Sequence, residues 1–326
     1  MLYLKNILSL VALLMPASVY AEFEWVSFTL DNDLFLGDDG GYTNGLYLAF
    51  YDSEKQATHP EPSWLLTPLQ WSIRDTSTVT AISAYTLGQT MVTPADITVT
   101  LPDKNDMPYA GLLFINSTFL SVNTNYADKI GVTLGVLGPL SLAEQSQKLI
   151  HKMLGSEEPK GWDTQLENEL VFQLDRARAW QFWQSNDQRW DLVTLADLTL
   201  GTISSAINAG AMIRYGTRLS DSYATTLFGN TRTTNPISIA GSWNLYAGIK
   251  AGYKFNDIFM DGNTYRDSHS IEYKHESVGV MLGFTFSWDG YSLALAATDS
   301  NLLVGKSGYP SESDARFGTL TLAIQL

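Results

Sequence analysis

Apolar and polar side chains alternate along much of this chain. The clearest stretch lies near residue 280, where every second residue is large and apolar and the residues between them are small or polar. The apolar set is Val278, Val280, Leu282, Phe284, Phe286 and Trp288. Successive side chains of a β-strand point to opposite faces, so the pattern predicts a strand with one lipid-facing side and one side turned to a filled or wet interior.

The same rhythm recurs in about twelve segments. They are residues 23–31, 42–52, 79–91, 110–123, 126–137, 166–180, 188–201, 205–218, 243–257, 271–288, 290–301 and 316–326. This predicts an all-β fold, a transmembrane antiparallel up-and-down β-barrel whose even strand number brings both chain ends to the periplasmic side. A soluble β-sandwich also alternates, but its outer face would be polar rather than rich in Trp, Phe and Leu. Lys250 and Lys254 fall on the inward face, which indicates a polar interior.

The N-terminus has the features of a secretory signal peptide. Lys5 precedes an apolar run over residues 7–15, and Val19 and Ala21 occupy the −3 and −1 positions of a cleavage site. We therefore expect residues 1–21 to be removed and residues 22–326 to form one barrel domain. No later stretch approaches the ~20 apolar residues of a membrane-spanning helix, and a closed barrel is the other structure that satisfies its backbone hydrogen bonds in lipid.

Composition narrows the function. The chain has no cysteine, which excludes disulfides, thiolate nucleophiles and cysteine metal sites. Its net charge of −14 argues against a nucleic-acid partner, because tracking phosphates requires clustered Lys and Arg. Acidic loops instead suit divalent cations or simple solubility.

The connections between the predicted strands differ in character. Those after odd-numbered strands would lie outside the cell, and one of them, residues 138–165, has apolar residues at helical spacing over 141–154 with Gly155 as a stop. The long connection over residues 53–77 would be periplasmic. Its Trp64, Leu65, Leu66 and Leu69 indicate a short amphipathic helix, to which we assign no chemistry.

Candidate catalytic residues gather in two of the outer connections. On the predicted helix Gln147 and His151 share a face, and Glu157 follows one turn beyond the stop. Strand alternation turns Asp33 and Thr43 inward, so we expect them to meet inside the outer mouth of the barrel. The neighbouring polar residues of that first connection are Asp31, Asn32, Asp38, Asp39 and Tyr42.

This set suits calcium-assisted hydrolysis. Oxygen-rich clusters select calcium, a neutral histidine can act as general base toward water, and a cation can hold the oxyanion of an attacked ester. Ordinary alternatives exist, since Asp38-Asp39-Gly40-Gly41 reads as a solvated turn and Asp31 and Asn32 can cap a strand. Of the four histidines, His59 should be periplasmic, while His269 and His275 lack oxygen ligands nearby in sequence, which leaves His151.

At these residues the chain resembles the LpxR family of outer-membrane lipid A deacylases, which remove the 3′-linked acyloxyacyl group of lipid A. The resemblance covers the first half of the mature chain, while the second half agrees only in strand rhythm. It rests on Asn32-Asp33, Gly41-Tyr42-Thr43-Asn44-Gly45-Leu46, Gly135-Val136-Leu137-Gly138-Pro139, Gln147, His151, Gly155, Glu157, Trp162 and Gln165-Leu166-Glu167-Asn168.

The resemblance implies a monomeric twelve-stranded barrel in the outer membrane whose active site faces lipopolysaccharide of the outer leaflet. The catalytic residues that it implies are His151 as base with Asn32, Asp33 and Thr43. It further implies a Ca²⁺ ion near Asp33 and Glu157, and we expect the residues that position substrate or catalytic groups to be Gln147, Asp31 and Tyr42.

One departure and two alternatives remain. The family's Lys-Arg pair in the second outer loop, thought to meet a lipid A phosphate, has no counterpart in residues 94–100, and Lys104 is the nearest basic residue. A calcium-dependent outer-membrane phospholipase would need a serine nucleophile beside a histidine, which we do not find on one inward-facing stretch. A non-catalytic channel or adhesin is also open, because Lys250 and Lys254 would suit a pore.

Overall fold

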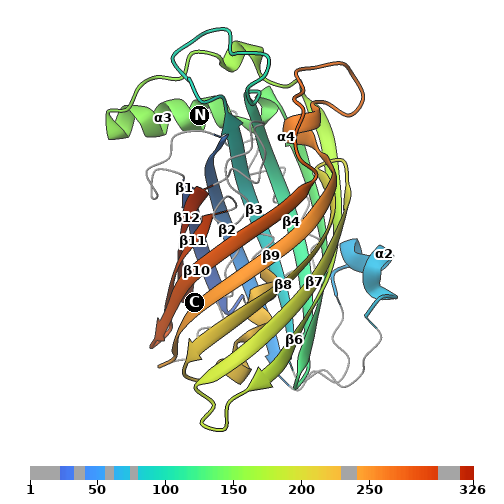
Figure 1. The fold of residues 1–326 in the computed structure, drawn as a ribbon, viewed down its shortest axis with the longest axis vertical. Helices are drawn as coiled ribbons and strands as arrows, with labels where there is room; N and C mark the ends of the chain where they lie inside the picture. The colour runs from blue at the N-terminus through green and yellow to red at the C-terminus, as the bar shows by residue number, and fades with distance from the viewer. Residues whose placement is uncertain (1–22, 33–40, 56–61, 74–79, 229–240, 300–315) are drawn as a thin grey trace.

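The structure, a computed structural model, describes residues 23–32, 41–55, 62–73, 80–228, 241–299 and 316–326. Within them, twelve antiparallel strands form a closed barrel in sequence order, with β1 paired to β12 (Figure 1). The strands are β1 (Trp25–Asn32), β2 (Gly41–Lys55), β3 (Thr80–Thr93), β4 (Ala110–Val122), β5 (Tyr126–Leu137), β6 (Glu169–Gln184), β7 (Trp190–Gly201), β8 (Ser204–Gly216), β9 (Trp243–Asp257), β10 (Glu276–Trp288), β11 (Tyr291–Asp299) and β12 (Arg316–Gln325). The expected barrel is confirmed, whereas the proposed signal peptide lies outside the described residues.

Short helices lie in the connections. They are η2 (Trp64–Leu66), α2 (Thr67–Gln70), η3 (Pro139–Ser141), α3 (Ala143–Leu154), η4 (Trp162–Thr164), η5 (Leu219–Asp221), η6 (Tyr223–Phe228) and α4 (Ile258–Asp261). None of the helices in the described part of the chain is long and apolar enough to cross a bilayer.

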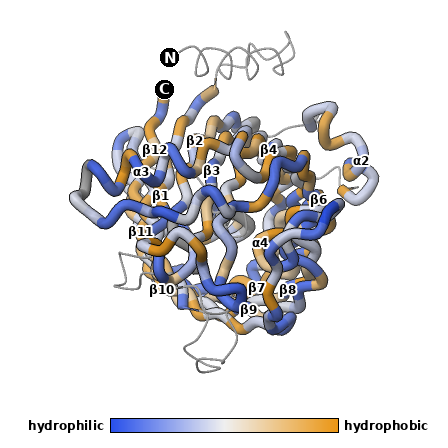
Figure 2. Tube along the Cα trace, turned by 90° about the horizontal axis from the view of Figure 1, so that it is seen from above, coloured by the Kyte–Doolittle hydropathy of each residue, from blue (hydrophilic) through white to orange (hydrophobic). Residues whose placement is uncertain are grey.

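Strand alternation has the predicted phase. In β1 the side chains of Ser27, Thr29 and Asp31 are buried, while Phe28 between them is half exposed. Thr29 contacts its register partner Thr321 on the neighbouring strand β12, with their hydroxyl oxygens 2.8 Å apart. Viewed from above, hydrophobic and hydrophilic residues interleave around the barrel (Figure 2).

Polar side chains fill the middle of the barrel. Lys129 is almost fully buried, and the Nζ atom of Lys250 lies 3.4 Å from a carboxylate oxygen of Asp197. Near the α3 end, Lys254 pairs with Asp257 at 2.6 Å. Both lysines of the pore interpretation are therefore held by carboxylates.

Apolar side chains close the mouth at the end where odd-numbered strands finish. The cluster consists of Val92, Met107, Ala110, Leu112, Leu137, Leu166, Val171, Ile258, Met260 and Phe317. It draws on strands, on α4 and on the connections, so this mouth is packed like a core.

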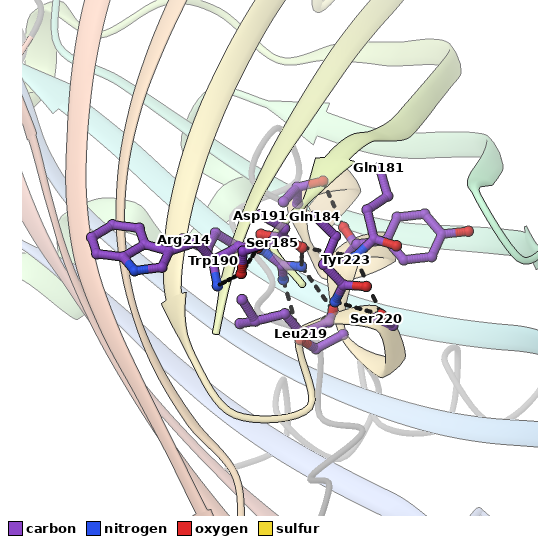
Figure 3. A network of polar contacts seen from close by, with 11 residues as sticks. Gln181, Gln184, Ser185, Trp190, Asp191, Arg214, Leu219, Ser220 and Tyr223 are labelled. Carbon is purple, nitrogen blue, oxygen red and sulfur yellow. Dashed lines mark hydrogen bonds and ion pairs between the residues drawn. The ribbon is translucent and has the colours of Figure 1, made fainter. Parts of the chain in front are cut away.

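The opposite end is closed by residues 217–228, which fold back toward the interior. Arg214 of β8 is buried and donates through Nε to Asp191 at 2.9 Å, and it also donates to the carbonyl oxygen of Leu219 at 2.8 Å (Figure 3). Tyr223 packs inside the barrel and donates to the carbonyl oxygen of Asn123. Together with the mouth cluster, this argues against an open channel.

Outward-facing aromatic residues encircle that same end. Tyr215 contacts Trp190 on one side and Trp243 on the other, with ring centroids 4.6 and 5.6 Å apart. Trp288 and Tyr291 continue the row with centroids 5.7 Å apart. Aromatic girdles of this kind mark the membrane–water interface of transmembrane barrels.

Candidate active site on the outer wall of the barrel

The helix α3 matches its sequence-based expectation, since it spans Ala143–Leu154 and Gly155 follows it with φ 71°. This left-handed conformation favours glycine, and the Gly155 N–H donates to the His151 carbonyl oxygen, which ends the helix. The side of α3 that packs on the barrel is not its leucine-rich side. Ala143 and Gln147 are buried, whereas Leu149 is 60% exposed.

The start of α3 lies on the outward face of the barrel wall, at the end where β3 finishes and β4 begins. Gly111 of β4 faces outward, and a Cβ atom there would lie 2.1 Å from the Cβ atom of Ala143, so only glycine permits this approach. Gln89 of β3 donates through Nε2 to the carbonyl oxygen of Ser141 at 2.7 Å. Met91 packs in one cluster with Ala143.

An outward row of residues marks the path that α3 takes. The strand registers pair Gly111 with Met91, Met91 with Asn44 and Asn44 with Asn32. Both views show α3 reaching toward the β1 side of the barrel (Figures 1 and 2). The helix contacts β4 and β3. Eight residues of helix cover about 12 Å, which is close to the roughly 14 Å of three strand steps, so a helix along this row has the length to approach β1.

His151 is held in one tautomer. Its Nδ1 atom lies 2.6 Å from the carbonyl oxygen of Glu157. Because a carbonyl oxygen only accepts, Nδ1 carries the proton and the neutral ring keeps its lone pair on Nε2. This is the form that a general base toward water requires.

Gln147 is fixed beside it. The side chain is 2% exposed, and its Oε1 atom accepts a 2.7 Å hydrogen bond from Nε1 of Trp162. This bond directs Nε2 the other way, and Nε2 finds no acceptor among the described residues. Trp162 itself packs against Tyr109 with the two rings tilted at 54°. Burial raises the pKa of Tyr109, and its hydroxyl donates to the carbonyl oxygen of Ile97. The site thus contains a buried amide donor without a protein partner.

The first outer connection is described only in part. Asp31 is fully buried and accepts a 2.7 Å hydrogen bond from Thr319, so it is turned into the barrel. Asn32 faces outward and is partly exposed. Asp33 lies outside the described residues, as do the side chains of Tyr42 and Thr43. The expected meeting of Asp33 and Thr43 therefore stays a prediction, and a bulge between Tyr42 and Asn44 breaks the alternation on which it was based.

The candidate calcium ligand Glu157 is exposed and forms no ion pair with a described residue. The backbone carbonyl of Glu157 contacts His151, so the Glu157 carboxylate and the His151 imidazole lie in the same short segment of the chain. A carboxylate is a hard oxygen ligand of the kind that calcium prefers. Within the ranges described, no three His, Asp or Glu side chains gather as a metal site. Asp33, the second expected ligand, is outside those ranges.

The second outer loop contacts two others. His269 of the connection after β9 has its Nε2 atom 3.1 Å from the carbonyl oxygen of Lys104. The backbone N–H of Lys160 donates to the carbonyl oxygen of Ile97 at 2.9 Å, which brings a basic residue from the α3 connection to this loop. Hydrogen bonds from Thr98 lower the pKa of Asp96, so the loop also carries a carboxylate.

Sequence reasoning missed two residues of this region. Asn44 faces outward in the row that α3 follows, yet it is 5% exposed, and its buried Oδ1 atom has no hydrogen-bond donor among the described residues. Trp162 was quoted in a motif but was given no role. An asparagine on the apolar side of a strand is a detectable signal for the first, whereas the Trp162 contact with Gln147 depends on the folded loop.

The comparisons agree with this architecture. A family model described as outer membrane protein LpxR matches residues 7–326. The chain belongs to the LpxR family. Among solved structures, LpxR from Salmonella typhimurium superposes with a TM-score of 0.71 at 13% identity, covering 93% of this chain and all of that one, which supports the shared fold. The translocator domain of NalP from Neisseria meningitidis covers 100% of this chain and 95% of its own, but with a TM-score of 0.43 at 9% identity. A comparison with curated protein sequences gave no match.

Membership of the LpxR family makes this an outer-membrane β-barrel. It also gives the apolar outer wall its partner, the membrane lipid. The helix α3 therefore stands on the lipid side of the wall and not over the closed mouth, and it carries Gln147 and His151, two of the site residues expected from the sequence.

Proposed function

We propose that this protein is a lipid A deacylase that removes the 3′-linked acyloxyacyl group by calcium-assisted ester hydrolysis at the extracellular leaflet. The observation that carries the proposal is the arrangement of His151. Its Nδ1–H is bound to the Glu157 carbonyl oxygen, and its helix lies on the lipid-facing wall. A base placed there meets esters of membrane lipids rather than solutes in the barrel.

Each side chain has a definite task in the reaction. Nε2 of His151 takes a proton from water as the water oxygen attacks the ester carbonyl carbon, and the protonated imidazole returns a proton to the leaving alkoxide. The buried Nε2 donor of Gln147 suits the oxygen on which negative charge develops. Asn32 and Thr43 belong to β1 and β2, the strands toward which α3 runs, and they would orient the ester.

The carboxylates of Asp33 and Glu157 would hold calcium. The chemistry of this donor set fits, because hard carboxylate oxygens are what Ca²⁺ prefers and Glu157 has no competing ion pair among the described residues. When bound, the ion supplies positive charge that stabilises the oxyanion of ester hydrolysis. Lipopolysaccharide of the outer leaflet is the partner, and the protein would act as a monomer.

The test is mass spectrometry of lipid A from bacteria with hexa-acylated lipid A that express the protein. We expect loss of the 3′ acyloxyacyl unit, abolition by a calcium chelator in isolated membranes, and recovery on adding calcium. His151→Ala should abolish the reaction. His269→Ala is the matched control, because this partly exposed histidine contacts a different outer loop and should leave activity intact.

Two results would contradict the proposal. Unchanged lipid A in excess calcium, from protein shown to be folded by its heat-dependent electrophoretic mobility, would remove the deacylase. Formation of lysophospholipid while lipid A stays intact would favour the phospholipase alternative instead. Full activity of His151→Ala would remove the mechanism and leave the activity standing.

A further inference from the structure

The long connection between β2 and β3 places a short segment against the outside of the barrel. Its helices η2 and α2 lie beside the wall in both views (Figures 1 and 2). Leu66 is 1% exposed and packs on outward residues of three strands, with Leu69 and Ile73 beside it. Those outward residues are Ala81, Phe119, Ile130 and Val132. The segment therefore covers wall that would otherwise contact acyl chains.

Its depth follows from the strand register. Tyr126 of β5 pairs with Trp180 of β6 at the end that carries the aromatic girdle. Ile130, which the segment contacts, lies four residues farther toward the α3 end. With ~3.4 Å per residue and a strand tilt of about 40°, this is about 10 Å inside the girdle. The segment thus lies at the level of lipid and not in the aqueous space beyond the strands.

A charged cluster on the same wall is covered by the end of this segment. Asp128 of β5 faces outward but is 1% exposed, and it accepts 2.8 and 2.6 Å hydrogen bonds from Arg178 of β6. Arg176 also binds Asp128, and it donates to the carbonyl oxygen of Ser72 at 3.3 Å. Charged groups on a lipid-facing wall are costly unless they are paired and shielded.

Two tryptophans of this segment are exposed. Trp64 is 64% and Trp71 69% exposed. Apolar aromatic rings exposed at this depth suit contact with acyl chains, and the indole N–H of Trp71 donates to the carbonyl oxygen of Pro68 at 2.8 Å within the segment.

We propose that residues 63–73 are embedded in the membrane leaflet at the end opposite α3, where Trp64 and Trp71 contact phospholipid and the segment shields Asp128 and Arg176 from acyl chains. The occupant of this surface is phospholipid, because the segment continues the barrel's own lipid-facing wall. The proposal does not depend on hydrolysis, so a catalytically inactive protein tests it equally well.

The absence of cysteine in the chain makes a site-specific test direct. Trp64→Cys, labelled with a nitroxide in phospholipid vesicles, should collide with oxygen more often than with a water-soluble nickel chelate. Leu134→Cys on the exposed outer face of β5 is the lipid control, and Thr124→Cys in the turn between β4 and β5 is the aqueous control. We expect the label at position 64 to give the same collision ratio as the label at position 134.

If the label at position 64 has the same collision ratio as the Thr124 label, the proposal is overturned. This holds for a surface that normally contacts water and for one that a periplasmic protein covers. A second measurement guards against disturbance by the label. The difference in fluorescence between the unmodified protein and Trp64→Phe isolates Trp64, and bromine-labelled phospholipid should quench that difference signal. Quenching by aqueous iodide alone would equally overturn it.

Discussion

Gly111 should control whether α3 sits correctly over the active site. In Gly111→Ala, the new Cβ atom would lie 2.1 Å from the Cβ of Ala143 and 2.3 Å from the Oγ of Ser141. Ser141 can rotate its hydroxyl away, but two carbons rest no closer than ~3.5 Å, so the helix must retreat by about 1.4 Å. The wall is held by strand pairing on both sides, so the displacement falls on α3.

The consequence for catalysis follows from that distance. A misplacement of about 1 Å can cost on the order of 100-fold in rate, so we expect a comparable loss in initial lipid A deacylation rate, with the barrel still folded. Overpacking should lower stability by only ~1–3 kcal/mol. Gly248→Ala is the matched control, because its nearest neighbours would lie at 3.4 to 3.5 Å, an ordinary contact.

The assay is the rate of lipid A deacylation in vesicles, measured by mass spectrometry on equal amounts of folded protein. Adding Ala143→Gly to Gly111→Ala removes the clashing carbon and should restore most of the rate. Wild-type activity of Gly111→Ala, or an equal loss in Gly248→Ala, would refute the idea that this contact positions the catalytic helix.

Two further predictions concern side-chain partners. Trp162→Phe removes the N–H that orients Gln147 and leaves a buried acceptor unsatisfied, at a cost of ~1–3 kcal/mol. We expect kcat to fall about tenfold or more with little change in KM. A double-mutant cycle with Gln147→Leu should show no additional loss of kcat. Additive losses would mean that Trp162 does not act through Gln147. Asp191→Ala leaves the guanidinium of Arg214 buried without its carboxylate, which should lower the free energy of unfolding by ~3–5 kcal/mol. The measurement is urea unfolding followed by tryptophan fluorescence. The control Arg218→Ala breaks an exposed ion pair and should change the stability little. Equal effects of the two would show that burial of the ion pair contributes nothing.

The strands were predictable from sequence because their cause is local. Phe28 and Leu48 face lipid and Thr29 and Tyr47 face the interior, and this alternation is visible in the chain without any knowledge of its neighbours. The end of α3 at Gly155 was predictable for the same reason, since a left-handed glycine stops a helix wherever the helix packs.

The packed face of α3 was not predictable in that way. Apolar residues at helical spacing predicted the helix but not which of its sides packs on the barrel. Leu149 is exposed, and the contact is made by Ala143 against Gly111, which lies 32 positions earlier in the chain. Likewise, the bulge between Tyr42 and Asn44 changes the strand phase only through pairing with β3.

What the sequence alone determined, then, is the barrel and its family, because repetition and short motifs record them. The choice of His151 as base stays a prediction. The tertiary structure decided that α3 lies on the lipid-facing wall, that Trp162 orients Gln147, and that residues 63–73 cover a charged cluster. Each of these depends on contacts between segments distant in the chain, where shape and polar pairing in three dimensions select one arrangement from many that the same residues would allow.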